Sequence, residues 1–150
     1  MKGLRMNRIR KMTQNDLPRV VELERDTFSI PWSEEGFLTA MQRSENCFLV
    51  IEDEKGVQGY CGYYRVLDEA EIMNVCINKA RRGQGLGSAM VEQLLKEAKE
   101  GGATRILLEV RVSNEPAIRV YKRLGFVPLG VRKGFYEKPV EDALIMQCDL

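Results

Sequence analysis

The sequence predicts a single α/β domain in which a mixed sheet is covered by helices. Helical periodicity dominates residues 13–43, strand-like segments dominate residues 47–77, and the two kinds of segment then alternate to the C-terminus. The chain has 150 residues, enough for one domain with a substantial core. No repeat or internal linker divides it. We therefore expect one domain over residues 1–150, with residues 1–6 as a disordered leader.

The opening part predicts a short strand and two helices. Residues 8–12 alternate weakly between polar and apolar side chains and indicate the first strand. A helix is expected over residues 17–28, because residues 13–16 offer caps and apolar residues then recur at helical spacing. The tripeptide before Ser33 contains proline and ends this pattern. Ser33 is positioned to cap a second helix over residues 34–43.

The middle of the chain predicts three strands and a long helix. Residues 47–52 and 57–66 are strand-like and flank a turn, and a third strand covers residues 71–77. A basic, glycine-rich loop then leads into an amphipathic helix over residues 88–99. Its expected apolar face comprises Ala89, Met90, Leu94 and Ala98.

The last part predicts one strand, one helix and a final pair of strands. Residues 104–111 form a strongly apolar run after two glycines, which is typical of a buried strand. A short helix over residues 114–124 ends at a glycine C-cap. Strands over 126–131 and 143–148 follow, and residues 134–139 belong to the connection between them.

Composition limits the possible partners. The chain is 44% hydrophobic and 30% charged, with a formal net charge of +1. This balance provides no broad positive field for nucleic acid, and no apolar run is long enough for a membrane span, so we expect neither as a direct partner. The N-terminus lacks the hydrophobic region of a signal peptide, which favours a cytoplasmic protein.

Two residue types limit the possible chemistry. The four cysteines are far apart in apolar segments, which predicts buried, reduced thiols. Histidine is absent, so the usual Ser-His-Asp and Cys-His mechanisms and the common zinc sites are excluded, and we expect no metal. An acid or base in this protein has to be a carboxylate, tyrosine, lysine, cysteine or water.

The glycine-rich loop predicts an anion-binding site. Gly83, Gly85 and Gly87 alternate at the positive N-terminal end of the predicted helix, and two arginines precede them. The loop is not a Walker motif, because no lysine follows Gly87. It is not a dinucleotide fingerprint either, because Ser88 and Met90 occupy the third glycine positions. Taken alone, the loop could equally be a structural turn.

The segment 82–87 fits the pattern R/Q-x-x-G-x-G/A and resembles the pyrophosphate-binding motif of the GCN5-related N-acetyltransferase (GNAT) family. Residues 108–114 and 117–126 together resemble the second acetyl-CoA motif of that family. Residues 30–33 and 141–146 resemble a narrower branch, the RimI-type ribosomal-protein-alanine N-acetyltransferases with their archaeal and eukaryotic relatives. The resemblance extends from about residue 8 to the C-terminus.

The resemblance implies the GNAT fold, a mixed and mostly antiparallel central sheet with a splayed pair of strands, flanked by helices. It also implies acetyl-CoA as co-substrate, with the splayed strand binding pantetheine and polarising the thioester carbonyl through a backbone N–H. Gly83 departs from many members, which carry a basic residue there; this weakens one phosphate contact and keeps the backbone cradle. The implied acetyl-CoA contacts are Val75, Cys76, Ile77, Arg82, Gly83, Gln84, Gly85, Leu86, Gly87, Ser88 and Asn114.

Two of these residues have alternative interpretations. Cys76 suggests a covalent acetyl-cysteine, but no histidine is available to activate its thiol, and the motif already accounts for the position. Asn114 precedes a predicted helix, so N-capping explains it as well as cofactor binding does, and both can hold together.

Acetyl transfer from a thioester to an amine needs a base for the amine and a proton for the departing thiolate. Glu109 is the candidate base, because it is a lone acid in an apolar run where burial raises its proton affinity. An ion pair with Arg111 is the structural alternative. Tyr121 is the candidate acid, and its alternative is a core tyrosine on a helix face. The resemblance favours the catalytic interpretation of both residues.

The acceptor is expected to be a protein or peptide N-terminus. Trp32, Phe135 and Tyr136 fall in two predicted connecting loops, and the resemblance implies that these loops clamp the peptide; simple anchoring of the loops is the alternative. The branch resemblance implies an alanine of a small-subunit ribosomal protein. A GNAT enzyme for lysine or small amines, or a non-catalytic CoA-binding module, remains an alternative function. The presence of both Glu109 and Tyr121 argues against the module.

Overall fold

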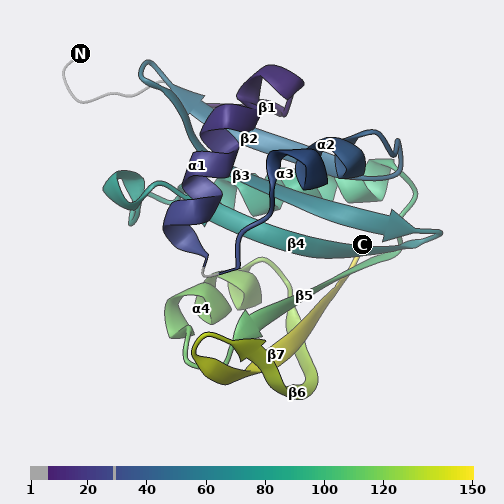
Figure 1. The fold of residues 1–150 in the computed structure, drawn as a ribbon. Coiled ribbons are helices and arrows are strands. Elements are labelled where there is room, and N and C mark those ends of the chain that lie inside the picture. The colour runs from purple at the N-terminus through teal and green to yellow at the C-terminus, as the bar shows by residue number, and fades with distance from the viewer. Residues whose placement is uncertain (1–6, 29) are drawn as a thin grey trace.

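The computed structural model describes residues 7–28 and 30–150, so the predicted leader lies outside the described residues. A seven-stranded sheet forms the centre in the order β1-β2-β3-β4-β5-β7-β6 (Figure 1). Neighbouring strands are antiparallel except β4 and β5, which are parallel. The strands are β1 (Arg8–Lys11), β2 (Cys47–Asp53), β3 (Gly56–Val66), β4 (Glu69–Ile77), β5 (Arg105–Arg111), β6 (Val127–Glu137) and β7 (Val140–Asp149). This confirms the predicted mixed sheet.

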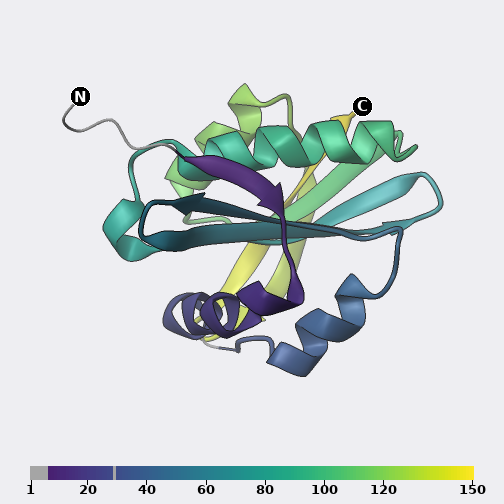
Figure 2. The same cartoon turned by 90° about the horizontal axis from the view of Figure 1, so that it is seen from above.

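Helices cover both faces of the sheet. Figure 2 shows α3 on one face and α1 and α2 on the other. Ser33 caps α2 as predicted, since its hydroxyl accepts a hydrogen bond from the Gly36 amide at 3.1 Å. The helices are α1 (Leu17–Thr27), α2 (Glu34–Met41), α3 (Leu86–Glu100) and α4 (Glu115–Arg123), with 3-10 turns η1 (Gln14–Asp16) and η2 (Lys79–Arg81). None of the helices in residues 7–28 and 30–150 combines the length and apolar character needed to cross a membrane.

The sheet separates two hydrophobic cores. The α3 core contains Met90 and Leu94 against Ile106 and Leu108 of β5, with α4 packed at its margin. The α1/α2 core contains side chains of both helices against β2, β3 and Cys76 of β4. Because side chains alternate along a strand, each residue of β4 and β5 belongs to one face or the other.

Strands β4 and β5 are joined only at their N-terminal ends. Three residue pairs connect them, from Glu69↔Arg105 to Glu71↔Leu107. Beyond these pairs the strands diverge, as Figure 1 shows, while β4 remains paired with β3 and β5 with β7. This is the splayed pair that the family resemblance implied.

Two predicted details are wrong. The helix α3 begins at Leu86 rather than Ser88, and Ala89 is exposed, because the buried face is formed by Leu86, Met90, Val91, Leu94 and Ala98. The last two strands are longer than predicted. They extend to Glu137 and from Val140, so Phe135 and Tyr136 lie within β6 rather than in a loop. The end of β6 remains part of the sheet because Tyr136 pairs with Glu141 of β7, and Glu137 pairs with Val140. The prediction of buried, free thiols is confirmed for all four cysteines.

Candidate functional site

The glycine-rich loop lies between β4 and α3 and turns through two left-handed glycines. Gly83 has φ 79° and Gly85 has φ 77°, and a β-carbon placed on either would meet no atom within 4 Å. Only the backbone conformation, rather than crowding, therefore requires glycine at these two positions. Gly85 is the N-cap of α3. The exposed loop thus presents free backbone N–H groups at a helix N-terminus, a geometry suited to a diphosphate.

The two arginines before these glycines have different environments. Arg81 is buried and forms an ion pair with Asp53 at 2.9 Å, so it stabilises the base of the loop. Arg82 is exposed, and its Nε donates to the Ile77 carbonyl at 3.3 Å. Because Arg82 is exposed and only its Nε is engaged in this bond, its guanidinium group is a candidate to bind an anion.

The end of β4 has one free edge. Val75, Cys76 and Ile77 pair with Cys61, Tyr60 and Gly59 of β3. In the described part of the chain, their other edge has no partner strand, because β5 has already diverged. Backbone N–H and C=O groups on this edge are therefore available to a ligand that enters the gap. This arrangement fits the pantetheine arm expected there.

The Cys76 side chain points away from this gap. Its sulfur lies 3.1 Å from the Thr27 hydroxyl and 3.5 Å from the Leu23 carbonyl oxygen, inside the α1/α2 core. Burial raises the pKa of the Cys76 thiol above its ordinary value. A raised pKa disfavours the nucleophilic thiolate, which argues against an acetyl-cysteine.

Glu109 lies on β5 just beyond the joined segment. Ile106, Leu108 and Val110 face the α3 core, so Glu109 faces the α1/α2 side of the sheet. Burial is the main cause that raises the pKa of Glu109, and the neighbouring Glu71 carboxyl adds to it. Such a carboxylate is a stronger base than an exposed one.

The predicted alternative partner of Glu109 is engaged elsewhere. Arg111 donates to Glu141 at 3.2 Å and to the Pro139 carbonyl at 3.0 Å. The cation near Glu109 is Arg132 of β6 instead, with 3.5 Å between Nη1 and Oε1. Arg132 is more than half exposed, so it weakly opposes the rise in the Glu109 pKa.

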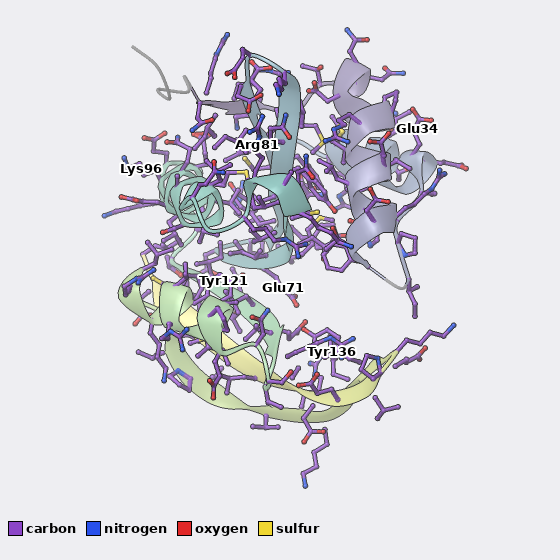
Figure 3. All side chains as sticks on the ribbon, turned by 90° about the vertical axis from the view of Figure 1, so that its left-hand side faces the viewer. Glu34, Glu71, Arg81, Lys96, Tyr121 and Tyr136 are labelled. Atoms are coloured by element: carbon purple, nitrogen blue, oxygen red, sulfur yellow. The ribbon has the colours of Figure 1, made fainter. Side chains whose placement is uncertain are left out.

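Tyr121 lies on the opposite face of the sheet from Glu109. It belongs to α4, packs at the margin of the α3 core, and its ring centroid is 5.7 Å from that of Phe126. Burial raises the pKa of Tyr121 to about 12, so its phenol is protonated at neutral pH. The strands β4 and β5 have no backbone pairing beyond Glu71↔Leu107, so the sheet parts between these two faces. Figure 3 shows Glu71 and Tyr121 near this parting of the sheet.

Asn114 caps α4, because its side-chain oxygen accepts a hydrogen bond from the Ala117 amide at 3.3 Å. The capping alternative therefore holds for this residue. Asn114 is exposed, so its amide N–H₂ is accessible to solvent and could also donate to a ligand.

The three aromatic candidates form two groups. Trp32 stacks on Tyr64 at 5.8 Å between ring centroids and contacts Phe37 at 5.3 Å, so it partly anchors the segment between α1 and α2. It also lines a surface cavity of about 780 Å³ that extends to Glu71. In the final hairpin, Phe135 and Tyr136 pack edge to face at 5.0 Å. The Arg111 guanidinium covers the Tyr136 ring at 4.2 Å.

The sequence analysis missed Glu24 and Glu71. Glu24 of α1 is 1% exposed and accepts hydrogen bonds from the Trp32 amide at 2.8 Å and from Asn74 of β4 at 3.2 Å. A signal for it existed, since this acid falls on the apolar face of α1. Glu71 had no such signal, because its contact with Glu109 depends on the register of two strands far apart in the sequence.

Comparisons with known proteins agree with this geometry. The profile of the acetyltransferase (GNAT) family matches residues 17–126. A ribosomal protein bS18-alanine N-acetyltransferase of Escherichia coli is 34% identical over 143 residues, covering 94% of this chain and 96% of that protein. A Bacillus subtilis protein named for the same reaction is 40% identical over 139 residues, covering 92% of each chain.

The crystal structure of the Escherichia coli ribosomal-protein-S18-alanine N-acetyltransferase superposes with a TM-score of 0.87 at 32% identity. The match covers 96% of this chain and 94% of that one. The protein is therefore an N-acetyltransferase that belongs to the GNAT family, within its branch of RimI-like ribosomal-protein-alanine N-acetyltransferases.

Proposed function

We propose that this protein transfers an acetyl group from acetyl-CoA to the α-amine of a protein N-terminus. The specific acceptor that we propose is the N-terminal alanine of ribosomal protein bS18. One observation carries the proposal: Glu109 and Tyr121 lie on opposite faces of the sheet, at the level where β4 and β5 diverge. An amine approaching from the Glu109 face and a thiol leaving on the Tyr121 face fit direct transfer through that gap. The names of the relatives at 34% and 40% identity support the acceptor.

Acetyl-CoA supplies the activated acetyl group as a thioester. The Gly83–Gly87 loop and Arg82 would hold its diphosphate, and the free edge at Val75–Ile77 would hold its pantetheine arm. Asn114 supplies a further amide donor. These contacts are mostly backbone groups, so they fix the position of the ligand with little side-chain reorganisation.

In this mechanism Glu109 accepts one proton from the amine, directly or through a water, and Tyr121 donates its phenolic proton to the departing sulfur. The raised pKa of Glu109 makes it a better base, and the raised pKa of Tyr121 keeps its proton available. Transfer from a phenol to a thiolate is uphill, so its rate depends on close positioning of Tyr121. After the reaction, Tyr121 takes up a proton from bulk water, and Glu109 releases its proton to bulk water.

An α-amine suits this base better than a lysine side chain. The α-amine has a pKa of about 8 and lysine about 10.4, so removing the lysine proton costs roughly 3 kcal/mol more.

We propose that Trp32 and Tyr136 flank the first residue of the acceptor, and that a small side chain fits there. A ribosomal protein as acceptor also implies that the enzyme acts in the cytoplasm. We propose that it works as a single domain, with neither a membrane nor a nucleic acid as a direct partner.

The test offers acetyl-CoA with peptides that begin with Ala, Ser, Met or Lys and measures the products by mass spectrometry. A matched Ala peptide has a blocked α-amine and a free lysine. We expect rapid acetylation of the Ala peptide at its α-amine and little of the blocked one. Equal rates for the blocked and free peptides contradict the proposal and favour a lysine enzyme, and no turnover on any amine favours a CoA-binding module.

A further inference from the structure

A second carboxylate stands beside Glu109 where the two strands part. Glu71 is the last residue of β4 that pairs with β5, opposite Leu107. Paired residues project to the same side of a sheet, and Glu109 follows Leu107 by two, so all three side chains share the α1/α2 face. The Glu71 carboxyl is near enough to the Glu109 carboxyl to raise the pKa of Glu109. In Figure 3, Glu71 is directed from its half of the sheet toward the other half.

The charged groups around this pair leave it with excess negative charge. Arg132 of β6 approaches Glu109 at 3.5 Å but is largely solvated. Tyr136 of β6 also faces Glu109, and burial together with that carboxylate raises the pKa of Tyr136, so it remains neutral. From α1, Glu24 is occupied by the Trp32 amide and by Asn74.

Glu71 of the pair is accessible from the cavity beside α2. Glu71 lines one end of this cavity of about 780 Å³, with the stacked rings of Trp32 and Tyr64. Glu35 of α2, Arg43 just after α2 and Arg65 of β3 line the same space, so the cavity carries charges of both signs. A peptide lying in the cavity can therefore present its first residue at Glu71, whose neighbour on the same face of the sheet is Glu109.

We propose that Glu71 and Glu109 together form the subsite for the acceptor's α-ammonium group, with Glu71 as the residue that holds the cation while Glu109 takes its proton. This assignment rests on the proposed α-amine acceptor. Two close carboxylates repel each other, and a bound ammonium group relieves that repulsion. An α-amine is largely protonated at neutral pH, so a site that accepts the charged form can use most of the available substrate.

The proton balance is simple. In the bound state both carboxylates are ionised and the amine carries one positive charge. One N–H bond breaks and one O–H bond forms on Glu109, which gives a neutral amine and a neutral carboxyl group. The new O–H of Glu109 donates a hydrogen bond to the ionised Glu71, so Glu71 stabilises the proton on the base. The net charge of the site does not change during this step.

The test is a charge series at one position: Glu71→Asp, Glu71→Gln and Glu71→Lys. The measurement is the pH profile of kcat/KM with the free Ala peptide, together with the separate KM values of peptide and acetyl-CoA. For Glu71→Gln we expect a peptide KM raised about tenfold and an acidic limb moved about one pH unit lower, because Glu109 loses a like-charged neighbour. Glu71→Lys should move both quantities further in the same directions, and Glu71→Asp should remain nearest the wild type.

Glu69→Gln is the matched control, since Glu69 lies on the same strand and face but forms an ion pair with Arg105 at the solvent. It should leave the profile and both KM values unchanged. Equal profiles in wild type, Glu71→Gln and Glu71→Lys, with acetyl-CoA KM preserved, overturn the assignment of Glu71. Because Glu71 is exposed, we expect all three variants to fold, and thermal melting verifies this. A wild-type protein that leaves the α-amine unmodified refutes the proposed function instead, so the two failures are distinguishable.

Discussion

The proposed cofactor side and the proposed acceptor side of the sheet, where β4 and β5 diverge, offer different kinds of chemical group. On the proposed cofactor side, the loop and strand edge are one continuous segment, residues 75–88, and backbone groups would provide most of the contacts. On the proposed acceptor side, the groups are side chains from α1, the segment after it, β4, β5 and β6, namely Glu24, Trp32, Glu71, Glu109 and Tyr136.

In this arrangement, backbone groups would bind the cofactor, and side chains would bind the acceptor and transfer its proton. A backbone cradle depends on φ angles and on a helix N-terminus, so one glycine substitution should abolish it whatever the acceptor. The acceptor side depends on burial and on pairs of charges, so its changes should alter rates and pH profiles while cofactor affinity remains. The four variants below test this separation, from the largest expected effect on turnover to the smallest.

Gly85→Glu should abolish acetyl-CoA binding and all turnover. Gly85 has φ 77°, which a side chain adopts only with strain, and the added carboxylate repels a diphosphate. Gly102→Glu is a matched control, because Gly102 has φ 101°, is equally open, and lies at the other end of α3. Calorimetry with CoA is the measurement. Wild-type affinity in a folded Gly85→Glu protein would remove the cofactor site from this loop.

The strand, glycine loop and helix of the proposed cofactor side were largely predictable because their information is local. The strand, the alternating glycines and the amphipathic helix are adjacent in the sequence, and each has a known backbone preference. The glycine at the helix start even accounts for the error at Ser88: Gly85 acts as the N-cap, so α3 begins two residues earlier than the side-chain pattern indicates. Arg81 was the exception, since its pairing with Asp53 depends on a distant turn.

Glu109→Gln should lower kcat by about 10²–10⁴-fold and leave CoA affinity unchanged, because an amide cannot accept the amine proton. Glu100→Gln, at the exposed end of α3, is the control. A pH–rate profile beside the wild type should show that the acidic limb disappears. Near-normal turnover would assign Glu109 a structural role.

Tyr121→Phe should lower kcat by about tenfold, a smaller loss because water can protonate the leaving thiolate. Tyr60→Phe serves as control: Tyr60 is fully buried and its hydroxyl has no hydrogen-bond partner in the described residues, so its removal should not change turnover. Steady-state kinetics with the Ala peptide separate the two variants. Equal, wild-type rates in both would exclude Tyr121 as the acid.

The acceptor side was only partly predictable because its contacts are set by tertiary structure. Glu109 was chosen as the candidate base from its apolar run, but its neighbours were not predicted: Arg111 pairs with Glu141, and Glu71 and Arg132 come from other strands. The extension of β6 and β7 was missed, since no apolar alternation marks residues 132–137. Strand register depends on residues that are far apart in the sequence, whereas a glycine turn can be predicted from a short segment.

Glu24 links this side of the site to the stability of the fold. Its carboxyl is buried below Trp32 and Asn74, and burial raises its pKa from an ordinary value of 4.5 to about 7, against the opposing effect of the two hydrogen bonds. The folded protein therefore binds a proton that the unfolded chain releases between these pH values. The free energy of unfolding is highest below pH 4.5, as far as this group contributes, and falls as the pH rises toward 7.

Glu24→Gln should remove this pH dependence while changing turnover only a few-fold, because the amide oxygen still accepts the Trp32 N–H. We expect the stability of the variant relative to wild type to rise by roughly 3 kcal/mol from acidic to neutral pH, following the shift of the Glu24 pKa. Urea unfolding at several pH values measures it, and Glu22→Gln on the exposed face of α1 is the control. The cost of replacing the carboxyl by an amide is the same at all pH values, so the slope of the stability against pH is the diagnostic quantity. Parallel stability curves for Glu24→Gln and wild type would mean that the pKa of Glu24 is the same in the folded and the unfolded protein, so that an ionised rather than a neutral carboxyl group holds the Trp32 segment at neutral pH.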